Sequence, residues 1–385
     1  MKNSKLLFAG FFCLLSLSLS AQKLNAIYPG AILPDDTGIH VNAHGGGILY
    51  HDGKYYLFGE HKGEKSSAAF VGVTCYSSED LYNWKYEGVA LPVETPDRAS
   101  LQPQSDIVSG SVIERPKVIY NEKTKKFVMY FHLELKDHGY EAARVAIAVS
   151  DKVTGPYKYL KSYRPNAGYW PINLPETGRD GACPVSTVDD FPEWWTPEWR
   201  QATIDGMFTR RDLAGGQMSR DMTLYVDDDG KAYHIYSSEE NLTLQLAELS
   251  DDYLSHTGKY IRIAPAGHNE APAIFKKDSK YFMITSGCTG WAPNAARLFT
   301  ADNIWGPWTE HSNPAVGEGA DLTFNSQSTF IQPVIGKKEV FIFMADRWTP
   351  KHPIDARYIW LPIQFENGLP VLKWLDKWDL SIFEN

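Results

Sequence analysis

Several features that identify common folds and enzymes are missing from this chain of 385 residues. It contains only four cysteines, and none are spaced like the paired ligands of a zinc site, so neither a zinc module nor a disulfide-held scaffold fits. No long stretch repeats apolar residues at helical spacing, which argues against an all-α fold. Outside residues 6–19 no apolar run approaches the length of a membrane span, so we expect no membrane insertion. The formal net charge of −9 argues against nucleic acid as a partner.

A nucleophile elbow of the form Gly-x-Ser-x-Gly is also missing, which decides how residues 44–47 are interpreted. These residues spell His-Gly-Gly-Gly, the string with which lipases and esterases build an oxyanion hole, but such enzymes need the elbow as well. The nearest stretch, residues 286–290, has Cys288 in place of the serine. We therefore exclude a serine esterase. The glycines are interpreted instead as letting an inner strand approach a central axis closely, with space left for a sugar.

The N-terminal residues 1–21 have the pattern of a secretory signal peptide. Lys2 and Lys5 precede the apolar run of residues 6–19, and small residues precede Gln22. We therefore expect a periplasmic or secreted protein whose mature part, residues 22–385, forms one catalytic domain and is a monomer. Aromatic residues make up 13% of the chain, which in an exported protein favours a surface on which sugars stack.

A repeated pattern runs through the chain. Five segments share an apolar strand, a short polar turn and an aromatic-rich strand, and they lie at 46–60, 116–134, 222–238, 271–287 and 328–348. Each is typical of a β-hairpin, because Asp-Gly, Asp-Ser or Gly-Lys stands at the tip and β-branched or aromatic residues fill both arms. The stretches between them supply outer strands, which in the last unit are RYIWLPIQF and LPVLKWLDKWDLS. The sequence therefore predicts an all-β fold, a five-bladed β-propeller.

The spacing between the second and third hairpins is broken at about 161–217 by a stretch rich in proline and tryptophan. We expect a long loop insertion there. Loops of this length in compact domains usually have a function or are disordered, and four tryptophans argue against disorder. One interpretation is that the insertion folds over one end of the propeller and walls a substrate cleft. The other is that it only covers a hydrophobic patch.

Polar residues stand at or just before the start of each inner strand, and in a propeller these positions point into a central funnel. They are His40, Asn42 and His44; Glu114 and Arg115; Arg220 and Asp221; Asn269 and Glu270; and Asn325, Ser326 and Gln327. Charged groups that converge on one axis shift each other's pKa values, as groups in active sites do. Glu114 and Glu270 are each followed by a proline two residues on, which favours an extended entry to the strand. Two carboxyls across a sugar-sized gap are what glycoside hydrolysis requires.

Several of these segments together resemble glycoside hydrolase family 43. The resemblance is carried by NAHGGGILYHDGKYYLFGE, ERPKVIYN, SRDMTLYVDDDGKAY, EAPAIFKKDSKYFMITSGCTGWAPN and NSQSTFI with MADRW, and it is closest to the branch of exo-β-1,3-galactanases. It covers roughly residues 35–380 apart from the insertion. It implies an exported, inverting, exo-acting glycoside hydrolase for the β-1,3-galactan side chains of arabinogalactan, a plant-type polysaccharide.

By this resemblance Glu270 is the general acid, and Glu114 is a carboxylate that tunes and orients it. Most members of the family carry an Asp as general base in the first blade, where this chain reads HVNAHGGG, and Gln327 holds the attacking water instead. The substrate pocket is expected to contain Glu60, His44, Tyr140, Asp221, Asn241 and Thr289. No metal or other cofactor is required, although some members of the family hold a hydrated calcium ion near the axis, where Asp221 is expected to lie.

Two other kinds of function stay open at this point. An α-L-arabinofuranosidase or a β-D-galactofuranosidase would keep the fold and change the sugar. A non-catalytic carbohydrate-binding propeller would explain the missing Asp. Glu114 and Glu270 argue against this last interpretation, because a binding protein has no use for two axial carboxylates beside buried apolar strands.

Overall fold

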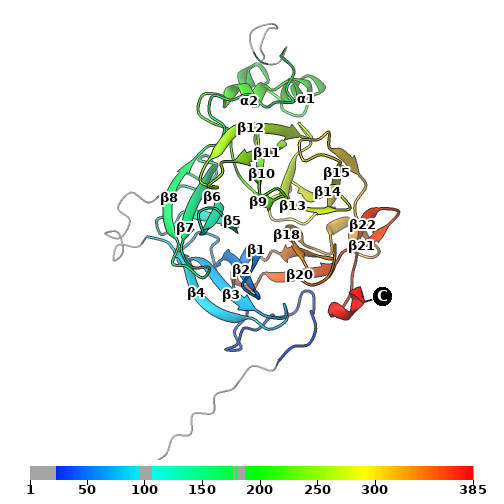
Figure 1. Ribbon diagram of the computed structural model, residues 1–385. Coiled ribbons are helices and arrows are strands. Elements are labelled where there is room, and N and C mark those ends of the chain that lie inside the picture. Colours follow the sequence, from blue (N-terminus) through cyan, green and yellow to red (C-terminus); the bar gives the residue numbers. More distant parts are fainter. Residues whose placement is uncertain (1–22, 95–105, 177–178, 180–186, 385) are drawn as a thin grey trace, which may run out of the picture.

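The computed structural model of the protein describes residues 23–94, 106–176, 179 and 187–384, so the expected signal peptide lies outside the described residues. The strands form six sheets, and five of these sheets contribute an inner strand to a central axis (Figure 1). The first sheet contains β1 (His44–His51), β2 (Lys54–Glu60), β3 (Gly72–Ser78) and β4 (Lys85–Pro92). The second contains β5 (Val112–Asn121), β6 (Lys126–Glu134), β7 (Arg144–Ser150) and β8 (Lys158–Tyr163). The third contains β9 (Met222–Val226), β10 (Ala232–Ser238), β11 (Thr243–Leu249) and β12 (His256–Ile263).

The fourth sheet contains β13 (Asn269–Lys277), β14 (Lys280–Gly287), β15 (Arg297–Ala301) and β16 (Thr309–His311). The two remaining sheets have three strands each. One contains β18 (Gln327–Pro333), β19 (Phe341–Arg347) and β20 (Arg357–Pro362), and the other contains β17 (Ala315–Val316), β22 (Leu369–Lys373) and β21 (Gln364–Glu366). Short 3-10 helices lie at η3 (Ala320–Leu322), η4 (Pro353–Asp355) and η5 (Leu380–Phe383).

The strands β1, β5, β9, β13 and β18 are the innermost strands and lie side by side around the axis (Figure 1). Each of them forms an antiparallel pair with the strand nearest to it in its own sheet. The propeller architecture and the five hairpins that the sequence predicts are therefore present. Because the inner strands converge, the residues at their starting ends are brought together at one end of the axis.

The prediction of five blades is wrong, because the structure has six sheets. The predicted fifth unit divides in two where β20 ends at Pro362, a residue with no N–H to continue a ladder. The strands after it, β21 and β22, pair with each other, and β22 pairs in parallel with β17. This pairing joins the C-terminal segment to the connection after β16, and no hairpin pattern in the sequence indicates it.

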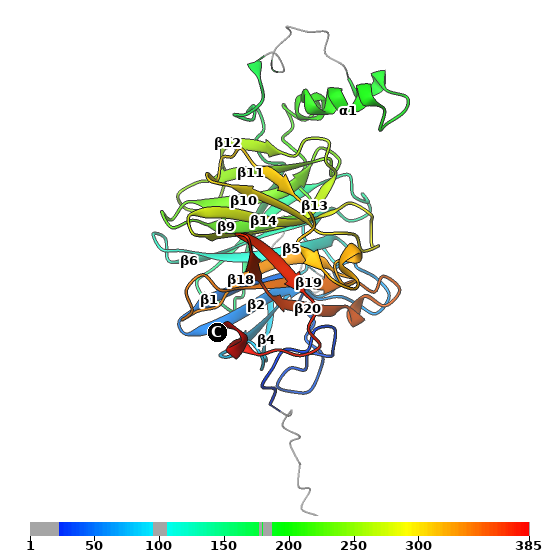
Figure 2. The same cartoon turned by 90° about the vertical axis from the view of Figure 1, so that its right-hand side faces the viewer.

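The segment between β8 and β9 is not the plain loop that the sequence predicts. It contains the 3-10 helix η2 (Val188–Asp190) and two short helices, α1 (Pro197–Ile204) and α2 (Met207–Arg211). The start of α1 follows common capping rules, with proline at the first position and the hydroxyl of Thr196 accepting a hydrogen bond from the Trp199 N–H. Both helices lie at the outer rim beside β12 (Figures 1 and 2).

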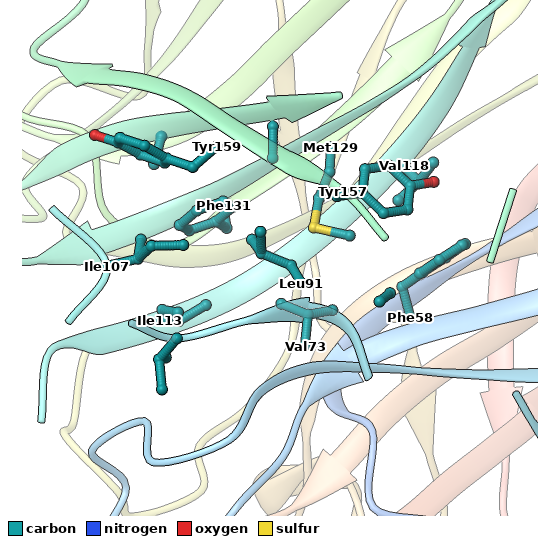
Figure 3. Packing of buried hydrophobic residues seen from close by; sticks show 14 of the residues in the cluster. Phe58, Val73, Leu91, Ile107, Ile113, Val118, Met129, Phe131, Tyr157 and Tyr159 are labelled. Carbon is teal, nitrogen blue, oxygen red and sulfur yellow. The ribbon is translucent and has the colours of Figure 1, made fainter. Parts of the chain in front are cut away.

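Buried apolar side chains fill the spaces between neighbouring sheets. Figure 3 shows the cluster between the first two sheets, where Phe58, Val73 and Leu91 meet Met129 and Phe131. Each such side chain contributes about 1.5–3 kcal/mol when it is removed from water, so this packing holds the sheets in fixed relative positions. Within the described ranges, none of the helices is long and apolar enough to cross a membrane.

Candidate active site

A cavity of about 280 Å³ opens at the end of the axis where the inner strands begin. It is lined by Glu60, Lys62, Glu114, Arg115, His132, Tyr140, Arg220, Asp221, Asn241, Glu270, Cys288, Gly290, Trp291, Gln327 and Trp348. The structure thus brings together seven of the predicted site residues, namely Glu60, Glu114, Tyr140, Asp221, Asn241, Glu270 and Gln327. It does not place His44 or Thr289 in the cavity. No described residue of the 161–217 segment lines it either, so the interpretation of that segment as a cleft wall is wrong for its described part.

His44 does not face the funnel as the sequence predicts. Its side chain is fully buried and stacks on the ring of Tyr358, with 5.2 Å between the ring centroids, and burial holds the pKa of His44 well below its usual value. The register of β1 shifts directly after His44, and this bulge turns the side chain away from the axis. A Cβ on Gly45 would lie 2.2 Å from Oε1 of Glu60, and one on Gly47 would meet the Lys117 side chain. The glycines therefore make room for Glu60 and Lys117, not for a sugar.

Thr289 is exposed and stabilises the turn beside the cavity. Its hydroxyl donates to the carbonyl of Ala292 at 2.6 Å and accepts from the amide of Asn294 at 2.7 Å. The neighbouring residues of the same turn, Gly290 and Trp291, line the cavity in its place.

Both axial glutamates lie directly before a β-bulge. The register of β5 shifts after Glu114, and that of β13 shifts after Glu270. The residue that follows each glutamate, Arg115 and Ala271, has a left-handed φ of 54° and 53°, and a proline comes next. Bulges re-aim the side chains beside them and are frequent next to active sites. The Glu-x-Pro pattern of both strands thus corresponds to a local geometry that turns each carboxyl into the cavity.

Glu270 is surrounded by neutral donors. Its Oε1 accepts hydrogen bonds from Nδ2 of Asn241 at 2.9 Å and from the thiol of Cys288 at 3.0 Å. Burial, together with the nearby charge of Asp221, raises the pKa of Glu270 to about 7. Burial and Glu270 also raise the pKa of Cys288 to about 12, so the sulfur stays a thiol and donates. Because Oε1 already accepts from two donors, a neutral Glu270 carries its proton on Oε2.

Glu114 is kept ionised by a neighbouring imidazolium cation. The hydroxyl of Tyr140 donates to its Oε1 at 2.9 Å, and Nδ1 of His132 lies 3.1 Å from its Oε2. The other ring nitrogen of His132 lies 2.8 Å from a second buried carboxylate, that of Glu134. Burial alone would lower the pKa of His132, but the two carboxylates outweigh it and raise this pKa to about 9. Burial likewise opposes the ionisation of Glu114, yet the hydrogen bond and charge of His132 lower the pKa of Glu114 to about 2.

The carboxamide of Gln327 has a fixed orientation. Its Oε1 accepts from Nη2 of Arg115 at 2.5 Å and from Nε1 of Trp348 at 2.9 Å, while its Nε2 donates to the hydroxyl of Ser286 at 2.9 Å. A guanidinium and an indole can only donate, so the atom that faces them is the oxygen. Arg115 also pairs with Asp221 at 2.8 Å and so connects two sides of the cavity. Gln327 therefore presents only N–H groups to a water molecule.

An aromatic mouth and a buried ion pair complete the cavity. The rings of Trp291 and Trp348 stand almost perpendicular, with 5.6 Å between their centroids, and Lys62 lies about equally far from both. Lys62 forms an ion pair with Glu60, which opposes the rise that burial causes in the pKa of Glu60. The two indoles provide faces on which a pyranose ring can stack. Both tryptophans lie in the motifs that carry the family resemblance, GCTGWAPN and MADRW, but the sequence alone assigned neither them nor Lys62 to the pocket.

A calcium ion does not fit the charged groups at the axis. The oxygen and nitrogen atoms of Glu114, His132 and Asp221 lie within 4.8 Å of one another. Calcium takes about six to eight oxygen ligands, whereas His132 offers nitrogens that already face carboxylates, and Arg115 already binds Asp221. The amine of Lys117 bonds to the Gly45 carbonyl at 2.9 Å, and burial lowers the pKa of Lys117 to about 7.

Comparisons with known proteins agree with this geometry. The sequence model of the family described as glycosyl hydrolases family 43 matches residues 200–369. A solved family 43 β-1,3-galactosidase in complex with galactodeoxynojirimycin is 58% identical, covers 92% of this chain and 100% of its own, and superposes with a TM-score of 0.87. An exo-β-1,3-galactanase from Phanerochaete chrysosporium, crystallised with β-1,3-galactotriose, is 30% identical over 92% of this chain and 68% of its own, with a TM-score of 0.72.

Among curated proteins, a β-D-galactofuranosidase from Aspergillus niger is 29% identical over 110 residues, which is 26% of this chain. The match spans about a third of the length of the curated relatives, 32% in that protein and 34% in a second one.

Proposed function

Because the chain belongs to glycosyl hydrolase family 43, we propose that it is an exo-acting glycoside hydrolase that removes galactose from β-1,3-linked galactan with inversion of configuration. The observation that carries this proposal is the pair of oppositely tuned carboxyls, with the pKa of Glu270 at about 7 and that of Glu114 at about 2 in one sugar-sized cavity. The β-1,3-galactosidase and the exo-β-1,3-galactanase support the choice of sugar and linkage.

In this proposal Glu270 is the general acid. At weakly acidic pH it is neutral, and it donates the proton on Oε2 to the glycosidic oxygen as the bond to the leaving sugar breaks. Glu114 stays ionised over the same pH range, so its negative charge faces the positive charge that develops on the sugar ring. The charge of Glu114 also raises the pKa of Glu270 and keeps it protonated. One carboxyl thus provides the proton and the other provides the field.

Gln327 positions the attacking water in this scheme but does not take its proton. The carboxamide nitrogen has no free lone pair, and Oε1 is already used by Arg115 and Trp348. One N–H of Gln327 binds Ser286, which leaves the other to hold a water. We assign acceptance of the water proton to Glu114, the carboxylate that is ionised at neutral pH.

The biological setting is a further part of the proposal. The pattern of residues 1–21 supports export to the periplasm or beyond, and the linkage supports an arabinogalactan-type polysaccharide as the natural substrate. The aromatic mouth formed by Trp291 and Trp348 suits the terminal sugar of such a chain.

A substrate panel tests the activity. We expect release of galactose from β-1,3-galactan and from aryl β-D-galactopyranoside, with the α-anomer as the first product seen by proton NMR. The galactofuranosidase among the curated relatives supports a furanosidase as the second candidate, so aryl β-D-galactofuranoside and aryl α-L-arabinofuranoside belong in the same panel. Preferred cleavage of a furanoside would replace the proposal with that candidate. Binding of galactan without release of sugar from any substrate would establish a carbohydrate-binding propeller.

A further inference from the structure

The turn between β10 and β11 has an unfavourable backbone. Glu239, Glu240 and Asn241 are three consecutive residues with left-handed φ values of 52°, 57° and 62°. Asparagine tolerates this conformation, but glutamate rarely adopts it. Such strained residues persist only where the surrounding structure holds them, and they gather at functional sites.

The helices α1 and α2 in the segment between β8 and β9, here called the helical insertion, contact this turn. Residues of α2 bind two of its side chains. The hydroxyl of Thr209 donates to Oε1 of Glu239 at 2.9 Å, and Arg211 forms an ion pair with Glu240 at 2.9 Å. The residue that follows the strained run, Leu242, is buried in a small apolar cluster. The other buried members of that cluster are Trp199, Met207 and Phe208, all from α1 and α2. The insertion therefore contacts the turn at three of its positions.

A buried arginine joins the same turn to α1. Arg262 on β12 binds both oxygens of Glu239, at 2.7 and 2.6 Å, and donates to the carbonyls of Thr203 and Ile204 at the end of α1. The side chains of Arg262 and Glu239 are almost completely buried, so this bidentate pair has little solvent to compete with it. The end of α1, the arginine and the turn form one connected unit.

Asn241 is the one residue of the turn that faces the cavity. Its Nδ2 donates to Oε1 of Glu270 at 2.9 Å, and its Oδ1 lies 3.2 Å from the hydroxyl of Ser237, which also donates to the carbonyl of Asn269 at 2.7 Å. The insertion thus lies behind the turn, and the catalytic carboxyl lies in front of it.

We propose that the helical insertion is a positioning element for the catalytic acid, which holds the turn 239–242 in its left-handed conformation and thereby keeps Asn241 bonded to Oε1 of Glu270. The insertion acts on the reaction without lining the cavity. With Oε1 bound, the transferable proton of Glu270 stays on Oε2. The inference rests on the proposed function, because it requires Glu270 to be the general acid.

The first experiment compares variants of the insertion on two substrates. Thr209→Val removes the bond to Glu239 at nearly constant volume. Arg211→Gln removes the ion pair with Glu240 together with the pair that Arg211 forms with its neighbour Asp212. Gln201→Ala is the matched control, since Gln201 is an exposed residue of α1 that bonds only within its own helix end, to Asp205. We expect kcat on β-1,3-galactobiose, whose leaving group needs a proton, to fall about 10- to 100-fold in the first two variants. Dinitrophenyl β-galactoside, which leaves without protonation, should lose less than about 3-fold, and the control should match the wild type.

A double-mutant cycle separates positioning from simple loss of stability. In the Asn241→Ala background, Thr209→Val should cause no further loss on galactobiose, because the bond that the insertion supports is already absent. Equal losses on both substrates, or full additivity in the cycle, would overturn the inference while the proposed function stood.

A measurement without substrate keeps the two proposals distinguishable. Titration of the Glu270 carboxyl by carbon NMR should show a higher pKa in Thr209→Val, Arg211→Gln and Asn241→Ala, because each loses a donor to the ionised carboxylate, directly or through the turn. An unchanged pKa in all three would refute the inference. If the wild type cleaves neither substrate, the proposed function fails, and this titration still decides whether the insertion sets the environment of Glu270.

Discussion

Glu114 and Glu270 lie in the same cavity and follow the same Glu-x-Pro pattern, yet their surroundings push their pKa values in opposite directions. Burial favours the neutral form of both. For Glu114, on β5, the effect of burial on the pKa is outweighed, because the buried imidazolium of His132 faces its carboxylate. On the β13 side the donors to Glu270 are an amide and a thiol, which are neutral, and Asp221 adds a negative charge. The imidazolium of His132, together with the charge of Lys62, therefore keeps Glu114 ionised, while Glu270 keeps its proton.

The strongest test of this difference is Glu270→Gln, which removes the acid and keeps the shape. We expect kcat/KM on β-1,3-galactan to fall about 10²- to 10⁴-fold, because the leaving galactan then departs unprotonated. Activity on dinitrophenyl β-galactoside should fall far less, since that group leaves without help. The control is thermal unfolding, which should be close to wild type. A variant that still hydrolyses galactan at the wild-type rate would remove Glu270 from the mechanism.

Glu114→Gln removes both the negative charge and the proposed acceptor of the water proton while it keeps the acid, and we expect a loss of at least about 10²-fold in kcat. The charge of Glu114 raises the pKa of Glu270, so its removal should lower that pKa from about 7. The alkaline limb of the pH profile of kcat/KM should therefore move to lower pH. If the limb stays in place or moves up, the two carboxyls are not electrostatically coupled in the way the structure indicates.

The sequence identifies these two carboxyls because each opens a predicted hairpin with a distinctive Glu-x-Pro pattern. The family resemblance places Tyr140, Asp221 and Asn241 in the pocket, but the sequence does not identify His132 or Cys288 as groups that tune the two carboxyls, because these reach them from a neighbouring strand and a loop. His132 stands directly opposite Glu114 in the β5–β6 register, a relation that a precise alignment of the hairpin arms could have revealed. Asn241 and Cys288 reach Glu270 from a turn and a loop whose conformations depend on tertiary contacts.

The predictions for His44 and for the number of sheets failed because both features depend on structure that local sequence patterns do not encode. His44 was expected in the funnel because it stands at the start of an inner strand, but a bulge directly after it turns its side chain away from the axis. The sixth sheet depends on a parallel pairing between β17, a strand of two residues, and β22 near the C-terminus, which no local pattern encodes. The hairpins, by contrast, are local structures, and all five are correct.

Replacing His132 tests whether this imidazolium causes the difference between the pKa values of Glu114 and Glu270. In His132→Gln, two buried carboxylates lose their positive partner, so we expect the free energy of unfolding to fall by about 3–5 kcal/mol and the pKa of Glu114 to rise. The acidic limb of the activity profile should then move to higher pH, and kcat at the optimum should fall about 10-fold. Glu134→Gln is the companion variant, because it keeps the imidazole and weakens only its charge. An unchanged acidic limb in both variants would show that His132 does not set the ionisation of Glu114.

The same cluster predicts how stability depends on pH. The pKa of His132 rises from 6.5 to about 9 on folding, so its contribution is complete below pH 6.5 and is lost as the pH rises through 9. The pKa of Glu114 falls from 4.5 to about 2, so its contribution is complete above pH 4.5 and is lost as the pH falls through 2. Urea unfolding should therefore show the greatest contribution of this cluster between pH 4.5 and 6.5. A wild-type and a His132→Gln profile of the same shape would contradict this assignment.

The smallest expected effect concerns the donor strength at Glu270. Cys288→Ser replaces a weak S–H donor with a stronger O–H donor, which favours the ionised carboxylate and should lower the pKa of Glu270. Cys288→Ala removes the donor and should raise that pKa. The alkaline limb of the pH profile should therefore lie at the lowest pH in Cys288→Ser, at an intermediate pH in the wild type and at the highest pH in Cys288→Ala. We expect shifts on the order of half a pH unit and rate changes of only about 2- to 5-fold. A residue that merely fills space beside Glu270 would not produce this order, because Ala and Ser differ little in size and should then shift the limb alike.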